Sequence, residues 1–260
     1  MPAQTVDEDW TIVLSAFATV IRRMSGQVLK LETSRYAEAH MDSADAERDR
    51  LAKVWRQRAQ QYGERCVLNL AHGPEGYRAE DARQKSLVYP WLRQALNGKE
   101  QTVLDFGCGA GRFTGDLFAL VNRGAAVGFD VSEDLLTIAR GSVDRATFIG
   151  DYSVLSSDQY AEYFDVIVVL TVIGGFSDAL CVETASLLAT RLKPEGLLFL
   201  AENTAEDIRG NGFWTLRPVS WYQELFREVD LNVVSKYWDL GAEVSIMTGR
   251  KKAIGSSTTR

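Results

Sequence analysis

The 260-residue chain has few of the residues that disulfide frameworks and membrane spans require. It has three widely spaced cysteines, Cys66, Cys108 and Cys181, and an odd, scattered set of this kind suits the reducing cytoplasm. No apolar stretch reaches the roughly 18 residues that a membrane-spanning helix needs. The acidic N-terminus is unlike a signal peptide. We therefore expect a cytoplasmic protein with no membrane partner.

The chain also lacks a run of Lys or Arg, and its formal net charge is −6. Nucleic-acid binding usually needs a clustered basic footprint, so nucleic-acid partners are not expected. Neither the scattered cysteines nor the spacing of the carboxylates points to a metal site, and none is predicted. The hydrophobic content of 46% is enough for a sizeable core. Composition thus predicts one enzyme domain with an N-terminal helical extension.

The most informative feature that is present is a strand followed by a glycine-rich turn at residues 103–114. Residues 103–106 have the pattern of a short buried strand, and helical spacing resumes over residues 112–121. The turn between them carries Gly107, Gly109 and Gly111. Glycines tolerate positive φ and have no Cβ, so a ligand can contact bare backbone at the helix N-terminus. The segment predicts a nucleotide-type cofactor loop.

The spacing of the glycines indicates which nucleotide the loop binds. A dinucleotide fingerprint, G-x-G-x-x-G or Ala, requires a small residue at the position that Arg112 occupies. The third glycine, Gly111, comes one residue too early for that fingerprint. The pattern is D-x-G-x-G-x-G, starting at Asp105. A nicotinamide-dependent oxidoreductase is therefore disfavoured.

This motif resembles the first motif of the class I S-adenosylmethionine (SAM) dependent methyltransferases. The resemblance implies SAM as cofactor, with S-adenosylhomocysteine (SAH) as product. It implies that the loop cups the methionine end of SAM, and that Asp105 orients the loop and the cofactor's amino group. The implied loop residues are Gly107, Cys108, Gly109 and Gly111, with Cys108 a small packing residue rather than a nucleophile.

Acidic residues follow the next two expected strands. Residues 125–130 form a strand ending in Asp130, whose carboxylate can accept hydrogen bonds from both ribose hydroxyls, with Val131 beside it. Residues 146–150 form the third strand, followed by Asp151 and Tyr152. The resemblance implies that this pair contacts the adenine. Leu170 and Thr171, near the end of a fourth strand at 164–173, are expected to complete the cofactor site.

The resemblance covers about residues 100–250 and implies an α/β, Rossmann-like fold. The sheet would have seven strands in the order 3-2-1-4-5-7-6, with the last strand antiparallel, flanked by helices. A helix, a turn and the fifth strand occupy 187–202, and residues 231–240 and 243–249 form a closing hairpin. A helix within 79–96 is broken or started near Pro90. We expect a helical extension and lid at 1–78, the SAM-binding domain at 79–254 and a disordered tail at 255–260.

Two helices are expected in the N-terminal extension. Residues 8–30 carry one apolar stripe, which docks either on the catalytic domain or on a second copy in a homodimer. Residues 32–48 read as a loop or short helix. A helix at 46–63 resembles the W-x-x-R-A-x-x-Y-G lid of small-molecule methyltransferases, which would direct Trp55, Arg58 and Tyr62 towards the active site, with Arg58 on the cofactor carboxylate. Alternatively, Trp55 and Tyr62 are ordinary packing residues.

The acceptor end is expected in the loop at 203–219, because loops at the carboxyl ends of strands bind ligands in open α/β sheets. The substrate-binding candidates are Trp55, Asn203, Trp214 and Arg217. Methyl transfer from a sulfonium depends mostly on positioning, and a hydroxyl acceptor also needs a base. His72 and Glu202 are the candidate bases; each is alternatively a loop or pocket hydrogen-bonding residue.

The sequence thus predicts methyl transfer to an oxygen or nitrogen of a small molecule, such as a sugar, a polyketide-like compound or another secondary metabolite. Residues 170–175, LTVIGG, lack the Asp/Asn-Pro-Pro-aromatic motif of enzymes that methylate the exocyclic amines of nucleic-acid bases. The alternative is a non-catalytic subunit with the same fold that binds or scaffolds a partner.

Overall fold

The computed structural model describes residues 33–122, 124–210 and 213–253, with side chains from residue 44 onward. The chain divides into two compact units, residues 1–47 and 48–260. The helix expected at 8–30 and the tail at 255–260 lie outside the described residues, so the dimer contact and the disordered tail stay predictions. The lid-like segment from Arg48 onward belongs to the same unit as the sheet.

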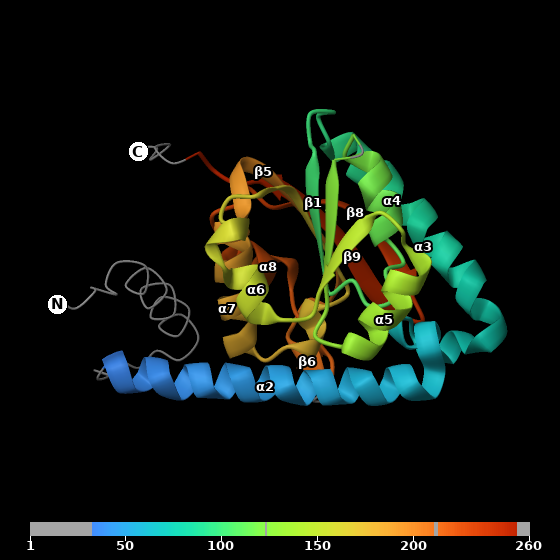
Figure 1. The fold of residues 1–260 in the computed structure, drawn as a ribbon, viewed down its shortest axis with the longest axis horizontal. Helices are drawn as coiled ribbons and strands as arrows, with labels where there is room; N and C mark the ends of the chain where they lie inside the picture. Colours follow the sequence, from blue (N-terminus) through green and yellow to red (C-terminus); the bar gives the residue numbers. More distant parts are fainter. Residues whose placement is uncertain (1–32, 123, 211–212, 254–260) are drawn as a thin grey trace. The chain divides into compact units, whose positions relative to one another are not determined.

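A seven-stranded sheet runs through the second unit in the order β3-β2-β1-β4-β5-β9-β8 (Figure 1). Its strand β9 pairs antiparallel with both β5 and β8, and the other pairings are parallel. The predicted order and the antiparallel last strand are confirmed. The strands are β1 (Thr102–Phe106), β2 (Ala125–Phe129), β3 (Ala146–Ile149), β4 (Phe164–Leu170), β5 (Leu192–Thr204), β8 (Asn232–Asp239) and β9 (Ala242–Arg250).

Helices cover both faces of the sheet, which explains why the central strands β1 and β4 are mostly apolar on both faces. Alternate residues of one strand enter different cores: Leu104 packs on the side of α6, α7 and α8, and Val103 on the side of α3 and α4. These helices are α3 (Gly73–Ala95), α4 (Thr114–Leu120), α6 (Tyr152–Ser156), α7 (Asp178–Arg191) and α8 (Val219–Leu225). A further helix, α5 (Glu133–Ser142), follows β2. The two layers hold the carboxyl ends of β1, β2 and β4 at one edge.

Several element boundaries differ from the sequence predictions. Helix α2 (Thr33–Tyr62) starts well before residue 46, because the Ala-rich stretch has high helix propensity even without an apolar stripe. The predicted break at Pro90 is absent: α3 continues to Ala95, and the buried Val88 and Leu92 anchor the helix on either side of the proline. Helix α4 begins at Thr114 rather than Arg112 because the glycine turn extends further.

The C-terminal third contains one element that was not predicted. Strands β6 (Arg209–Gly210) and β7 (Thr215–Leu216) form a separate two-stranded ribbon inside the expected acceptor loop. The closing hairpin turns at Leu240 (φ 47°) and Gly241 (φ 83°), the pair of positive φ values that a tight hairpin turn requires. Among the described residues, every helix is too short or too polar to cross a membrane.

Candidate functional site

The glycine loop between β1 and α4 has the backbone that its sequence predicts. Gly107, Gly109 and Gly111 have φ values of 75°, 54° and 77°, a region that favours glycine. Two loop amides, from Gly107 and Cys108, donate to the Phe129 carbonyl oxygen at 2.7 and 2.9 Å. The end of β2 therefore fixes the shape of the loop after β1.

Each glycine of the loop also makes a close protein contact. A Cβ on Gly107 would lie 2.4 Å from a Val172 methyl group, and one on Gly109 would lie 2.6 Å from Val67. A Cβ on Gly111 would lie 3.1 Å from the Cβ of Ala139 on α5. The glycines thus serve the packing of the loop against its neighbours as well as the approach of a ligand.

Asp105 lies near the end of β1 and is 4% exposed. Its Oδ2 accepts a hydrogen bond from Thr114 Oγ1 at 2.6 Å, which ties β1 to the first turn of α4. Burial raises the pKa of Asp105 to about 6, against an ordinary value of 3.8. A buried carboxylate of this kind is stabilised by any donor or cation that a ligand brings.

Asp130 follows β2 directly and uses both carboxylate oxygens within the protein. Oδ2 accepts from the Gly109 amide at 2.9 Å, and Oδ1 accepts from the Ser132 amide at 2.8 Å. Burial raises its pKa to about 6 as well. Each carboxylate oxygen has a second lone pair, so Asp130 holds the glycine loop and can still accept hydrogen bonds from a ligand.

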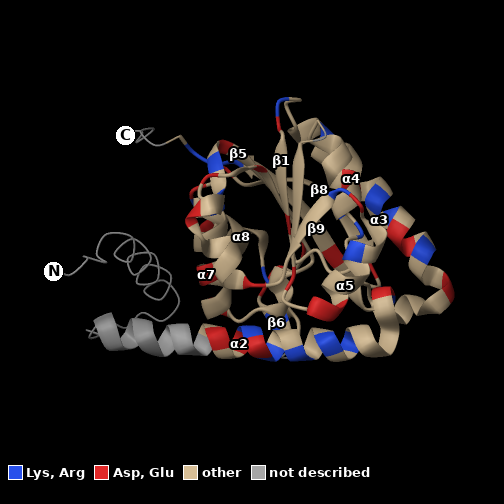
Figure 2. Ribbon diagram, in the orientation of Figure 1, with Lys and Arg blue, Asp and Glu red and all other residues tan. Residues whose placement is uncertain are grey.

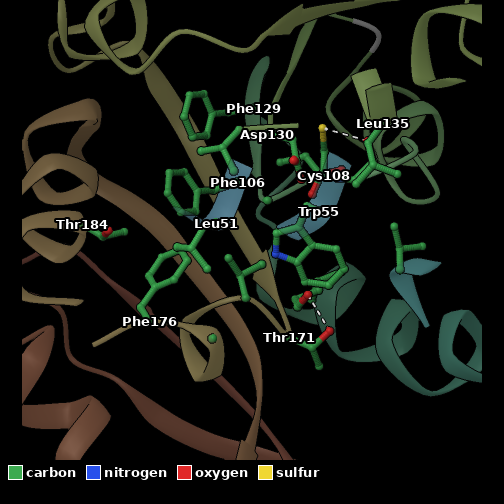
Figure 3. Close-up of a pocket in the computed structure, with 18 of the residues that line it drawn as sticks. Leu51, Trp55, Phe106, Cys108, Phe129, Asp130, Leu135, Thr171, Phe176 and Thr184 are labelled. Atoms are coloured by element: carbon green, nitrogen blue, oxygen red, sulfur yellow. Dashed lines mark hydrogen bonds between the residues drawn. The ribbon is translucent and has the colours of Figure 1, made fainter. Parts of the chain in front are cut away.

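A pocket opens at the carboxyl ends of β1, β2 and β4, between these loops and the part of α2 that begins at Arg48 (Figure 3). Trp55 of α2 extends its indole into the pocket, with Asp130 and Cys108 on one side and Thr171 on another. Most of the predicted cofactor residues line this pocket: Asp105, Gly107, Cys108, Gly109, Asp130, Val131, Tyr152, Leu170 and Thr171. Of the predicted substrate residues, Trp55 and Trp214 line it.

Four predicted cofactor residues lie outside this lining. Gly111 packs on α5, and Asp151 is an exposed N-cap that accepts from the Ser153 amide at 2.8 Å. Arg58 donates to the Cys66 carbonyl oxygen at 3.2 Å and lies over the Trp55 ring, 5.2 Å from its centroid. Tyr62 lines a separate hollow beside His72. Their predicted contacts with SAM stay predictions.

The two candidate bases, His72 and Glu202, lie outside the pocket lining. His72 Nε2 lies 2.7 Å from Asp239 Oδ1 and 3.9 Å from Glu80 Oε1, away from the pocket lining. Glu202 is fully buried below the loop after β4, where its carboxylate accepts from three consecutive backbone amides. Burial raises the Glu202 pKa to about 7, but its oxygens face the protein backbone. In the described structure both residues bind protein groups, and their role as bases stays a prediction.

Two predicted substrate residues are likewise committed elsewhere. Asn203 Oδ1 accepts from the Trp214 indole nitrogen at 3.1 Å, so it positions an aromatic residue that does line the pocket. Arg217 is 1% exposed, and its guanidinium binds Asp178 and two backbone carbonyls. The sequence identified both residues as polar but could not show that their partners are protein groups.

Sequence reasoning missed a group of lining residues from helices and strand ends. Phe106 and Phe129, the last residues of β1 and β2, stack with ring centroids 5.2 Å apart. Their place at strand ends was a usable signal. Arg112 lines the pocket and forms an ion pair with Asp81 at 2.6 Å. The other missed lining residues are Arg48, Leu51, Val67, Phe113, Leu135, Val172, Gly175, Phe176, Leu180 and Thr184.

Comparisons with known proteins agree with this geometry. A family model described as a methyltransferase domain matches residues 103–196, the segment that supplies the glycine loop and Asp130. This stretch is similar to a methyltransferase domain. The predicted resemblance is thereby confirmed, and SAM is the cofactor of this family.

A curated relative, the ubiquinone biosynthesis O-methyltransferase of Hydrogenovibrio crunogenus, is 29% identical over 116 residues. This match spans 43% of the chain and 46% of the relative, so it covers less than half of either protein. A structure of a DhpI–SAH complex has a TM-score of 0.57 at 16% identity, covering 79% of this chain and 97% of that one. A SAM-dependent methyltransferase of Leishmania major has a TM-score of 0.57 at 20% identity, covering 76% of this chain and 83% of that one. At these identities the solved structures establish the fold.

Proposed function

We propose that the chain transfers the methyl group of SAM to an oxygen of a small molecule, with nitrogen as the alternative acceptor atom. One observation carries the proposal: Asp105, the glycine loop and Asp130 come together in a single pocket at the carboxyl edge of the sheet. Open α/β sheets bind their ligands at this edge. The partial match to an O-methyltransferase favours oxygen over nitrogen.

Five residues are suited to hold the cofactor. In this proposal Asp130 accepts hydrogen bonds from the ribose hydroxyls, and Asp105 lies beside the methionine amino group. Tyr152 and Val131 border the adenine. Arg58 Nε is buried without a hydrogen-bond partner among the described residues, and its guanidinium lies over Trp55 at the pocket. A cofactor carboxylate would satisfy that donor, as the lid-like motif of α2 implies.

The acceptor would lie against aromatic side chains. Trp55 and Trp214 line the pocket, and Phe213 lies beside Trp55 with ring centroids 6.5 Å apart. Aromatic walls favour a flat, largely apolar acceptor through stacking and burial. A polyketide-like or other ring-containing metabolite therefore fits the pocket better than a sugar.

The chemistry depends on positioning rather than on a strong base. Within the described lining, the carboxylates are Asp105 and Asp130. Asp105 accepts a hydrogen bond from Thr114 of α4, and Asp130 accepts one from the Gly109 amide of the glycine loop. The sulfonium is an excellent leaving group, and in-line placement of the acceptor lone pair about 3 Å from the methyl carbon supplies most of the acceleration. An acceptor that ionises readily, such as an acidic phenol, meets these conditions.

A radiolabelled transfer assay tests the proposal. The purified chain is incubated with methyl-labelled SAM and a panel of phenols, catechols, aliphatic alcohols and amines. The expected result is labelled product from the phenolic members and SAH formation in equal amount. Binding of SAH without transfer to any panel member would instead favour the alternative of a non-catalytic subunit. Nicotinamide-dependent turnover would revive the oxidoreductase hypothesis.

The remaining expectations concern the partners and the cellular compartment. Cys66, Cys108 and Cys181 are free and buried, which supports the cytoplasmic prediction. Figure 2 shows Lys and Arg interspersed with Asp and Glu along α2 and α3, an arrangement that suits a small-molecule enzyme better than a nucleic-acid partner. A homodimer through residues 8–30 stays a prediction.

A further inference from the structure

The loop that connects β4 to α7 forms one wall of the pocket. It runs through the 3₁₀ turn η4 (Ile173–Gly175) to the N-cap Ser177, and Thr171, Val172, Gly175 and Phe176 line the pocket. Thr171 has a φ of 54°, an uncommon value for a residue with a branched Cβ. A short loop with such a backbone needs contacts that fix its conformation.

Glu202 holds this loop by its amides. Its carboxylate accepts from the amides of Val172 at 2.8 Å, Ile173 at 3.0 Å and Gly174 at 3.4 Å. Successive backbone amides directed at one anion form a concave anion site, here occupied by a side chain of the adjacent strand β5. Glu202 is 0% exposed, so solvent does not compete for these bonds.

Arg217 holds the same loop by its carbonyls. Its guanidinium donates to the Ile173 oxygen at 3.3 Å and to the Phe176 oxygen at 2.7 Å. It also binds Asp178 Oδ1 through Nε at 3.1 Å and through Nη2 at 2.9 Å. Arg217 therefore joins the end of the loop to Asp178, the first residue of α7. Arg217 binds carbonyl oxygens of the loop, whereas Glu202 binds its amides.

The loop in turn sets two parts of the pocket. Val172 fills the space beside Gly107, where a Cβ would lie 2.4 Å from its methyl group. Gly174 lies against the Trp214 indole, where a Cβ would come within 2.5 Å of the ring. The indole is also held by Asn203. A shift of the loop at residues 171–176 would therefore move Val172 away from Gly107 of the glycine loop, and would also move the Trp214 side chain that lines the pocket.

We propose that Glu202 and Arg217 are positioning residues for the acceptor. Glu202 binds amides within residues 171–176 and Arg217 binds carbonyl oxygens of the same segment; together these contacts form a clamp that fixes the loop, and with it the Trp214 side chain that lines the pocket. This proposal rests on the proposed methyl transfer for its catalytic consequence, but the clamp itself is testable without it. Neither residue contacts the ligand. Arg217 keeps its ion pair with Asp178 when Glu202 is replaced, so the two residues hold the loop through separate sets of contacts.

Backbone hydrogen exchange of residues 171–176, measured by mass spectrometry, tests the clamp directly. In Glu202→Ala the amides of 172–174 should exchange about tenfold faster or more, since each loses a charge-assisted hydrogen bond. Glu202→Gln should retain much of the protection, because Val172 and Ile173 both bind the single oxygen Oε1. Arg217→Lys should also loosen the loop, since an ammonium lacks the fork that reaches two carbonyls and Asp178.

Glu100 provides a matched control at the other end of the sheet. It is 4% exposed, accepts from the Asn97 and Gly98 amides and pairs with Arg250 at 2.9 Å. Glu100→Ala should lower global stability while exchange at 171–176 stays as in the wild type, with β4 amides as the internal reference. Unchanged loop exchange in both Glu202→Ala and Arg217→Lys, or an equal rise in Glu100→Ala, would overturn the proposal. If Glu202→Ala does not fold, Arg217→Lys decides the question.

Kinetics separate positioning from plain stability. With a panel compound that the wild type methylates, Arg217→Lys should raise the acceptor KM by a larger factor than the SAM KM, because Trp214 packs directly on the loop. A rise of the SAM KM as large as that of the acceptor KM would contradict a role in positioning the acceptor. If the wild type methylates nothing, the proposed function fails, and the exchange result still decides the clamp.

Discussion

Replacing Asp105 by Asn should stabilise the ligand-free protein while it weakens SAH binding. Asp105 is 4% exposed, and its Oδ2 accepts a hydrogen bond from Thr114 Oγ1. Burial raises its pKa from 3.8 to about 6, so the ionised form is disfavoured in the folded state. An Asn side chain keeps an acceptor for Thr114 and removes the buried charge.

The magnitude follows from the pKa difference between the folded and unfolded states. An acid with a raised folded-state pKa contributes stability that is present below its unfolded pKa and is lost as pH rises through its folded pKa. A shift of about two units corresponds to roughly 3 kcal/mol once both states are ionised. The gain from Asp105→Asn should therefore grow from about 0.5 kcal/mol at pH 4 to about 3 kcal/mol at pH 8.

Urea unfolding of the wild type and Asp105→Asn at pH 5 and pH 8, without ligand, measures this difference. Asp144, an exposed residue, supplies the control variant Asp144→Asn, which should change stability little at either pH. A gain for Asp105→Asn that is equal at both pH values, or a loss at pH 8, would refute the reasoning. SAH calorimetry on the same variant should show weaker binding, the functional consequence of removing the charge.

Three further predictions concern the cofactor. Asp130→Ala should weaken SAH binding by about 1–3 kcal/mol, because both the ribose contacts and the Gly109 anchor are lost; unchanged affinity in calorimetry would mean the ribose lies elsewhere. SAH affinity of the wild type should fall from pH 8 to pH 5 as Asp105 and Asp130, with pKa values raised to about 6, become protonated; an affinity independent of pH would contradict their role as acceptors. Gly107→Ala should reduce SAH affinity through its φ of 75° and the 2.4 Å approach to Val172, and an unaffected affinity would show that the loop relaxes without cost.

The sequence was most informative about site residues that lie at the ends of the parallel strands. Asp105 and Asp130 each lie at or after the end of a strand, and parallel strands bring their carboxyl ends to one edge, so their proximity could be predicted from order alone. The glycine spacing indicated positive φ at three positions, and the structure has it at all three. The hairpin around Gly241 was predictable for the same local reason.

The sequence was least informative about the partners of buried polar groups. Glu202 and Arg217 were expected to face a ligand, yet they bind the backbone of a loop some 30–45 residues earlier in the chain. The hydrogen-bond partners of such buried residues are decided by tertiary packing, which is not visible as a pattern in the neighbouring sequence. Leu180 and Thr184 show the same limit, because they line the pocket only through the way α7 packs beside the loop after β4.

A crystal structure of the protein with SAH tests the central claim most directly. The account predicts the adenosyl group in the pocket beneath α2, with the ribose hydroxyls on Asp130 and the methionine end beside Asp105 and Gly107. SAH bound at another place on the chain, or a glycine loop closed by protein with no SAH at millimolar ligand, would contradict it.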